Sequence, residues 1–157
     1  MTRVALDTNI LVYAEGLQST PSDQPKVDTA RRLMRGLILS EERPVIPVQV
    51  LAELHRVLQR KGGLARSEVA ERVARFRSLG DIVATTPDTF DLAVTLAGAH
   101  DLPTFDAIIL AAAVQSRCDL LVSEDLHDGF TWRGVTVSNP FGLSPDRRIA
   151  RLLTPTP

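Results

Sequence analysis

Four acidic residues border apolar stretches that should be buried, and none has a Lys or Arg beside it in the sequence; they are Asp7, Glu53, Asp106 and Asp125. A buried carboxylate without a partner loses its hydration, and several that converge repel one another. A divalent metal ion relieves both costs. The types and settings of these residues therefore predict a metal site built from carboxylates.

Two of the acids also have an ordinary explanation at the start of a helix. Asp7 ends the apolar run Val4-Ala5-Leu6, where it or Thr8 could cap the helix that follows. Asp106 opens an apolar helix, where the positive end of the helix dipole favours an acid. These explanations account for one residue at a time. If the four acids do not share a site, their positions require four separate coincidences.

The other two acids leave different alternatives open. Glu53 shares a helix face with Val50 and Val57 and lies too far into the helix for capping, so its alternative is a boundary residue whose carboxylate reaches water. Asp125 lies in a polar turn with Glu124 and Asp128. The sequence leaves open whether either of these neighbours replaces or supplements Asp125.

The elements that must position these acids are short strands alternating with helices. Apolar runs predict strands over residues 3–6, 45–46, 82–85, 119–122 and 134–137. Helix-spaced apolar residues and capping signals predict helices over residues 8–15, 27–39, 47–61, 67–79, 87–99 and 104–117, with a loop over 17–26. This alternation predicts a three-layer-like α/β fold, a short central parallel sheet flanked by helices.

Such a sheet offers a way to bring the acids together. Asp7 and Asp125 each follow a strand, and in open α/β sheets ligands gather where the strands end. If those strands are parallel neighbours, the two carboxylates share one edge. We expect one domain over residues 1–143 and a C-terminal tail over 144–157 that is frayed or held by a partner.

Composition excludes several classes of protein. The chain has 157 residues, a net charge of -1 and one cysteine, so it has neither a global basic field nor an intrachain disulfide. It has three histidines, none paired at ligand spacing, so a structural zinc site is not expected. No stretch has membrane-spanning length and no signal-peptide pattern precedes the first strand, so we expect a cytoplasmic protein.

Cations gather locally although the net charge is small. Residues 56–77 hold seven of them, which could form a ridge facing RNA phosphates or could be ordinary solvated helix faces; they are Arg56, Arg60, Lys61, Arg66, Arg72, Arg75 and Arg77.

The order and setting of the acids resemble the PIN-domain ribonucleases, especially the VapC-type toxins. The matching segments are Val4-Ala5-Leu6-Asp7-Thr8-Asn9, Val48-Gln49-Val50-Leu51-Ala52-Glu53-Leu54, Thr104-Phe105-Asp106-Ala107-Ile108-Ile109 and Leu121-Val122-Ser123-Glu124-Asp125. Each segment alone is a weak signal, whereas all of them in this order are fairly specific. The resemblance extends from Arg3 to about Phe141.

The resemblance implies a metal-dependent endoribonuclease, the toxin of a type II toxin–antitoxin pair. Mg²⁺ or Mn²⁺ would be held by Asp7, Asp106 and Asp125, because hard ions prefer oxygen ligands. Glu53 would complete the catalytic set or position the attacking water. The resemblance also implies RNA products with a 3′-hydroxyl and a 5′-phosphate, a small antitoxin partner and a homodimer. Polar residues would orient the carboxylates or touch phosphate; they are Thr8, Asn9 and Ser123.

Rival classes make different demands on the sequence. A haloacid dehalogenase-type phosphoryl-transfer enzyme needs a second Asp two residues after the first, where this chain has Asn9, and a downstream Lys that is absent after Gly80. A response-regulator receiver lacks the same Lys. The remaining rival is a PIN-like module that binds RNA or protein without cutting, and a metal-dependent cleavage assay distinguishes it from a nuclease.

Overall fold

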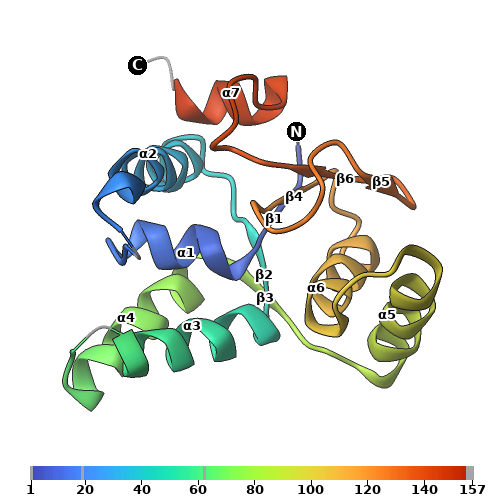
Figure 1. Ribbon diagram of the computed structural model, residues 1–157, viewed down its shortest axis with the longest axis horizontal. Coiled ribbons are helices and arrows are strands. Elements are labelled where there is room, and N and C mark those ends of the chain that lie inside the picture. Colours follow the sequence, from blue (N-terminus) through green and yellow to red (C-terminus); the bar gives the residue numbers. More distant parts are fainter. Residues whose placement is uncertain (1, 19, 62, 155–157) are drawn as a thin grey trace.

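A computed structural model describes residues 2–18, 20–61 and 63–154 and shows a central sheet surrounded by helices (Figure 1). The strands are β1 (Val4–Leu6), β2 (Val45–Pro47), β3 (Asp81–Val83), β4 (Leu120–Val122), β5 (Thr131–Trp132) and β6 (Val135–Ser138). The helices are α1 (Thr8–Ala14), α2 (Gln24–Leu39), α3 (Val48–Lys61), α4 (Arg66–Leu79), α5 (Pro87–His100), α6 (Thr104–Gln115) and α7 (Arg147–Leu153), with a 3-10 turn η1 (Pro21–Asp23).

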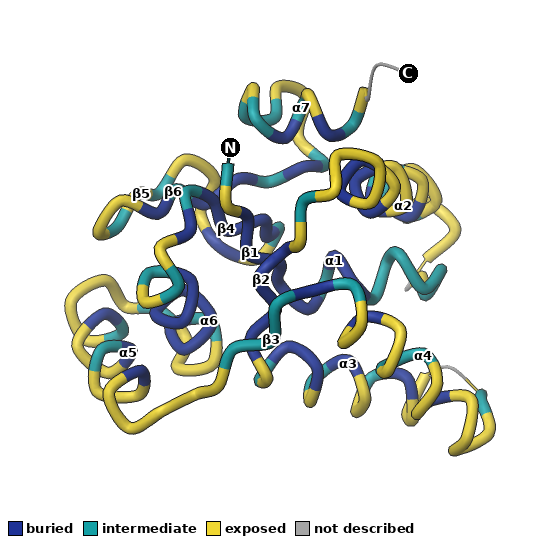
Figure 2. The backbone as a smooth tube through the Cα atoms, turned by 180° about the vertical axis from the view of Figure 1, so that it is seen from behind, coloured by how far each residue is buried: buried dark blue, intermediate teal, exposed yellow. Residues whose placement is uncertain are grey.

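The sheet has the order β3-β2-β1-β4-β6-β5, and every pair is parallel except β5 with β6. The predicted α/β class with a central parallel sheet flanked by helices is confirmed, with β5 as an antiparallel addition at one side. The strands at the centre, β1, β2 and β4, are buried throughout (Figure 2). Burial on both faces explains why they read as continuous apolar runs rather than alternating patterns.

The helices surround the central sheet in packed groups (Figure 1). Helix α5 packs on α6, α3 on α4, and α2 on both α1 and α7. The predicted start of α5 is confirmed, since Thr86 Oγ1 accepts a hydrogen bond of 3.2 Å from Thr89 N–H and Pro87 occupies the first turn. No helix within the described ranges is long and apolar enough to cross a bilayer.

The sequence missed strand β5 and placed the start of α2 too late. Strand β5 is two residues long and joins β6 through Arg133 and Gly134, which both have positive φ (46° and 88°), the backbone of a tight hairpin turn. An Arg at the first turn position hides this signal, because Asn or Asp is usual there. Helix α2 begins at Gln24 rather than 27, since Pro25 is accommodated in a first turn that needs no donor.

Residues 147–153, which lie in the tail expected to be frayed or held by a partner, form helix α7. Ile149 and Leu152 are buried, and α7 packs closely on α2 at Gly36. A Cβ added to Gly36 would lie 1.9 Å from the carbonyl oxygen of Leu152. The close backbone approach therefore depends on glycine at this position, while the boundary between a domain over 1–143 and a tail stays a prediction.

Gly36→Ala should lower the free energy of unfolding by about 1–3 kcal/mol, because the methyl group must displace the backbone of α7. Gly98→Ala is the matched control, since a Cβ on Gly98 in α5 meets nothing within 4 Å. That control should raise stability by roughly 0.5–1 kcal/mol. Urea titrations measure both, and equal effects of the two substitutions would contradict the packing role of Gly36.

Candidate active site

The acids gather because β1 and β4 are parallel neighbours. Leu6 is in register with Val122, so the residues that follow each strand emerge at the same edge of the sheet. The backbone N–H of Asp7 donates a 3.0 Å hydrogen bond to the carbonyl of Val122, which extends this pairing to the acid itself. The condition that the sequence left open, parallel neighbouring strands, is met.

Asp7 is the most buried of the acids, with 3% of its surface exposed. Its Oδ1 accepts a 2.6 Å hydrogen bond from Thr8 N–H, and its Oδ2 accepts one of 2.6 Å from the Ser123 hydroxyl. Burial raises the pKa of Asp7 from 3.8 to about 6 against the lowering effect of these bonds, and the charges of Asp106 and Asp125 raise it further. Asp7 caps α1 and also belongs to an electrostatically coupled group.

Glu53 projects from α3 with both oxygens held. The Thr8 hydroxyl donates a 2.8 Å hydrogen bond to Oε2, and Gln49 Nε2 donates one of 2.8 Å to Oε1. Thr8 therefore links the Asp7 side of the site to α3. Gln49 is a supporting residue that was not predicted from the sequence, although its position four residues before Glu53 on one helix face could have indicated the contact.

Asp106 lies half-buried in the first turn of α6. Burial raises its pKa, and the negative charges of Asp125 and Glu53 raise it further. Within the described residues neither oxygen of Asp106 accepts a hydrogen bond, so both remain available to a ligand. Asp106 is affected by the charges of Asp125 and Glu53, and Asp7 by those of Asp106 and Asp125. All four predicted acids therefore lie near one another.

Asn9 and Ser123 connect the remaining acid to Asp7. Asn9 Nδ2 donates a 3.0 Å hydrogen bond to Asp125 Oδ2 and lies 3.4 Å from Asp7 Oδ2. The Ser123 hydroxyl also accepts hydrogen bonds from the backbone N–H of Asp125 (3.2 Å) and Leu126 (3.4 Å). The predicted supporting residues therefore all contact the carboxylates, and Asn9 Oδ1 is buried without a hydrogen bond in the described part of the chain.

The two acids that crowd Asp125 in the sequence point elsewhere. Glu124 pairs with Lys26, with 2.8 Å between Oε2 and Nζ, and accepts a hydrogen bond from the Tyr13 hydroxyl. Asp128 Oδ1 accepts a 2.8 Å hydrogen bond from Asn139 N–H. Both carboxylates are thus engaged by other partners, and Glu124 lines the same cleft as Asp125.

The donor set fits a hard divalent cation, because every candidate ligand is a carboxylate, hydroxyl or amide oxygen. Across residues 2–18, 20–61 and 63–154, no group of at least three Asp, Glu, His or Cys side chains stands in an arrangement ready to hold one ion. Mg²⁺ usually retains several waters and takes only one or two carboxylates directly. A partly hydrated ion that binds one or two of these carboxylates therefore fits this arrangement better than an ion enclosed by side chains.

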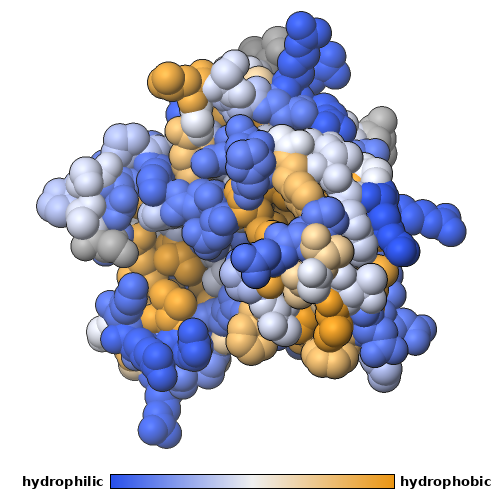
Figure 3. Space-filling view, turned by 45° about the vertical axis from the view of Figure 1, so that its right-hand side comes forward, coloured by the Kyte–Doolittle hydropathy of each residue, from blue (hydrophilic) through white to orange (hydrophobic). Residues whose placement is uncertain are grey.

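A cleft of about 420 Å³ leads away from the acids between α1 and α3. Thr8, Asn9, Glu53 and Asp125 line one end, while Lys61 lies two turns along α3 from Glu53. Val12, Leu17 and Val57 supply apolar surface between them. On the face of the molecule that Figure 3 shows, apolar side chains gather in separate areas between hydrophilic ones. The cleft thus extends from the acids to one cation, Lys61.

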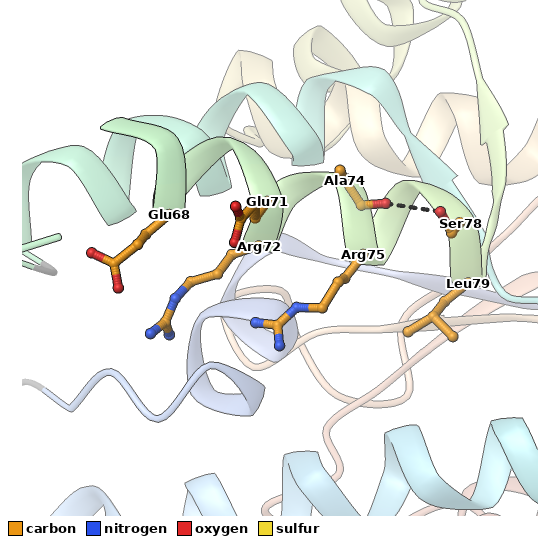
Figure 4. A pocket seen from close by; sticks show the side chains of 7 residues that line it. All are labelled: Glu68, Glu71, Arg72, Ala74, Arg75, Ser78 and Leu79. Atoms are coloured by element: carbon orange, nitrogen blue, oxygen red, sulfur yellow. Dashed lines mark hydrogen bonds between the residues drawn. The ribbon is translucent and has the colours of Figure 1, made fainter. Parts of the chain in front are cut away.

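A larger groove of about 750 Å³ runs along α4 and is remote from the acids; its lining residues are Glu68, Glu71, Arg72, Ala74, Arg75, Ser78 and Leu79 (Figure 4). Arg72 and Arg75 pair with the Glu15 carboxylate at 2.7 Å and 3.2 Å. Since the Glu15 side chain is only 7% exposed, these cations compensate a buried acid. They are therefore engaged in structural contacts, unlike the exposed cations at the end of α3.

The fold and the site together define an α/β domain with an acidic centre at the carboxyl edge of its sheet. The sequence matches the PIN domain family over residues 4–127, and the chain belongs to that family. Among curated proteins, none matches this sequence.

Solved structures resemble the chain in fold. A toxin–antitoxin complex from Klebsiella pneumoniae contains a chain that aligns with a TM-score of 0.62 and 21% identity, covering 88% of this chain and 98% of that one. VapC20 of Mycobacterium tuberculosis, a toxin that cleaves the sarcin-ricin loop, aligns with a TM-score of 0.58 and 20% identity, covering 75% and 86%. At these identities the likeness concerns the fold.

Proposed function

We propose that this chain is a metal-dependent endoribonuclease and the toxin of a type II toxin–antitoxin pair. The observation that carries the proposal is the convergence of Asp7, Glu53, Asp106 and Asp125 at one sheet edge, with pKa values raised at Asp7 and Asp106. Asp7 is buried, Glu53 and Asp106 are partly buried and Asp125 is exposed; acids that repel one another in such a setting are unfavourable for folding alone, which is typical of functional sites. Membership of the PIN domain family supports the same function, as do the toxin–antitoxin complex and the VapC20 toxin among its structural neighbours.

In this proposal each acid has a separate task. Asp7, Asp106 and Asp125 would hold Mg²⁺ or Mn²⁺, which when bound lowers the pKa of water and stabilises charge on a phosphodiester. Glu53 would orient the attacking water through an Oε atom, and the fixed hydrogen bonds from Thr8 and Gln49 would keep that carboxylate in place. The hydrogen bonds from Ser123 to Asp7 and from Asn9 to Asp125 would keep these two carboxylates in position relative to each other.

The test is cleavage of end-labelled RNA with Mg²⁺ or Mn²⁺, with and without EDTA, followed by mapping of the product ends. We expect cleavage that requires the metal and leaves a 3′-hydroxyl and a 5′-phosphate. The same ions should raise the melting temperature, because a ligand that binds the native state stabilises it. Metal-independent binding of RNA without cleavage would instead identify a non-catalytic PIN-like module.

We also propose a small antitoxin partner and a homodimer. A chain of a toxin–antitoxin complex shares this fold over 98% of that chain's length, which supports the proposal of an antitoxin partner. Light scattering of the purified protein tests the dimer, and co-expression with the adjacent reading frame tests the antitoxin. A monomer at all concentrations would contradict the dimer alone.

Neutralising the cations at the end of α3 should weaken RNA binding with little effect on metal binding. Arg56, Arg60 and Lys61 are exposed, and Lys61 lines the acidic cleft. For single-stranded RNA, the slope of log K against log salt should become shallower by about 0.7 for every phosphate that a cation no longer binds. Filter binding of the Arg56→Gln, Arg60→Gln, Lys61→Gln triple variant over a salt series measures this slope.

The matched control neutralises exposed cations away from the cleft, namely Arg32 and Arg35 on α2 and Arg151 on α7. If both triple variants change the slope equally, net charge rather than the α3 cations guides RNA. An unchanged slope in the first variant would mean that this face is solvated or contacts a protein.

A further inference from the structure

Lys26 lies in a compact cluster beside the acidic site, and two members of this cluster, Tyr13 and Glu124, line the same cleft as Asp125. Its Nζ is 2.8 Å from Glu124 Oε2, 3.3 Å from the Tyr13 hydroxyl and 3.9 Å from Asp23 Oδ1. The same ammonium group lies 5.3 Å and 5.9 Å from the ring centroids of Tyr13 and Phe141, within cation–π range. The cluster thus joins α1, the first turns of α2 and the segments after β4 and β6.

Glu124 is the member that connects this cluster to the site. The Tyr13 hydroxyl donates a 2.9 Å hydrogen bond to Oε1, and Lys26 binds Oε2, so each carboxylate oxygen has a partner. The Tyr13 and Phe141 rings meet edge to face at 5.3 Å, which closes the cluster on its apolar side. Glu124 is consequently held in one direction by contacts from separate elements.

The next residue, Asp125, contacts Asn9, which lies one turn before Tyr13 on α1, and both acids line the same cleft. Residues 124–126 form a bend directly after Ser123, so contacts that hold the Glu124 side chain also restrain the backbone that presents Asp125. Left free, Glu124 would add another negative charge beside Asp7, Asp106 and Asp125 and could compete for a cation. The contacts of Lys26 and Tyr13 therefore engage both oxygens of Glu124 and restrain the backbone at Asp125.

We propose that Lys26, Tyr13 and Glu124 form a clamp that positions Asp125 for metal binding, an inference that rests on the proposed nuclease function. These are positioning residues, because they act through Asp125 and are not themselves ligands. Lys26 retains 35% side-chain exposure and Glu124 19%, so the ion pair contributes modestly to stability and its loss should leave the fold intact.

The test is a Mn²⁺ titration by calorimetry on the full chain carrying Lys26→Met, Glu124→Gln or both. Each single variant should weaken Mn²⁺ binding by about tenfold, as is usual when a group that orients a ligand is removed. The double variant should be no weaker than either single one, because both remove the same contact. Lys26→Arg keeps a cation and should recover most of the affinity.

The control breaks an ion pair of comparable geometry at the opposite edge of the sheet. Arg43→Gln removes the 3.0 Å contact with Asp81 at the start of β3, and it should leave the Mn²⁺ affinity at the wild-type value. Melting curves without metal verify that every variant folds.

A direct ligand role for Glu124 gives a different pattern. Lys26→Met would then free a carboxylate and leave the affinity unchanged or increase it, while Glu124→Gln alone would reduce it, and this result would overturn the clamp. Wild-type affinity in both single variants would overturn it as well. RNA cleavage is scored separately, so a wild type that binds Mn²⁺ but cuts no RNA refutes the nuclease function and leaves the clamp to be judged by the titration.

Discussion

Asp7→Asn should lower the rate of RNA cleavage by at least about two orders of magnitude, or roughly 3 kcal/mol of transition-state stabilisation. The amide removes a charge that a bound cation requires. It keeps the shape of the side chain, and its oxygen can still accept the hydrogen bond from Thr8 N–H, so α1 retains its cap. Single-turnover cleavage with Mn²⁺ measures the rate, and wild-type activity in a folded variant would leave Asp7 with the capping role alone.

The same substitution should change how metal-free stability depends on pH. Burial raises the pKa of Asp7 from 3.8 to about 6, so the folded state holds this proton more tightly than the unfolded chain does. The contribution of Asp7 to wild-type stability should therefore fall as the pH rises from about 4 to about 6 and stay level above that. The difference between the two pKa values corresponds to roughly 3 kcal/mol of folding stability. Because Asn cannot ionise, Asp7→Asn should abolish this pH dependence.

Ser123→Ala provides the control for this pH dependence. The variant keeps an ionisable Asp7 and removes the 2.6 Å hydrogen bond that lowers its pKa. Its stability should continue to fall to a higher pH than that of the wild type. Melting curves in EDTA across this range test both variants, and a wild-type profile in Asp7→Asn would assign the pH dependence to other groups.

The sequence predicted the parts of the molecule that depend on local pattern and on the rules of parallel sheets. The runs ending in Asp7 and Asp125 are buried strands, and their parallel pairing brings the acids together at one edge. Glu53 and Asp106 lie on α3 and α6 as their helix spacing indicated. The assignment of these acids as catalytic and metal-binding residues stays a prediction, which the substitutions at Asp7 and Glu53 test.

The features that escaped prediction depend on contacts between distant segments. Lys26 and Glu124 are 98 positions apart, the difference of their residue numbers, and nothing near either residue in sequence indicates the pair. Helix α7 is short, and packing on Gly36 of α2 rather than intrinsic propensity holds it in place. Arg72 and Arg75 read as free cations because their partner Glu15 lies far away in the sequence. Side-chain pairing of this kind becomes visible only when the fold is known.

Glu53→Leu should abolish cleavage and metal-induced stabilisation while leaving metal-free stability within about 1 kcal/mol of the wild type. From the sequence alone, we expect metal-free stability to stay level or to rise by about 1 kcal/mol, because removing the charge relieves repulsion with nearby acids. The structure adds an opposing cost. The Thr8 hydroxyl donates to Glu53 at 2.8 Å and Thr8 is only 8% exposed, so Leu leaves a buried donor without its partner.

Two further variants separate these opposing effects. Glu53→Gln removes the charge but keeps an oxygen for the Thr8 hydroxyl, so it should lose cleavage and match or exceed wild-type metal-free stability. Adding Thr8→Val to Glu53→Leu removes the unsatisfied hydroxyl and should recover about 1 kcal/mol or more. Thermal melts with and without Mn²⁺ and cleavage assays on the same preparations provide the comparison. If Glu53 is instead a boundary residue that only supports Thr8, Glu53→Gln will cleave RNA at the wild-type rate, because the hydrogen bond survives without the charge.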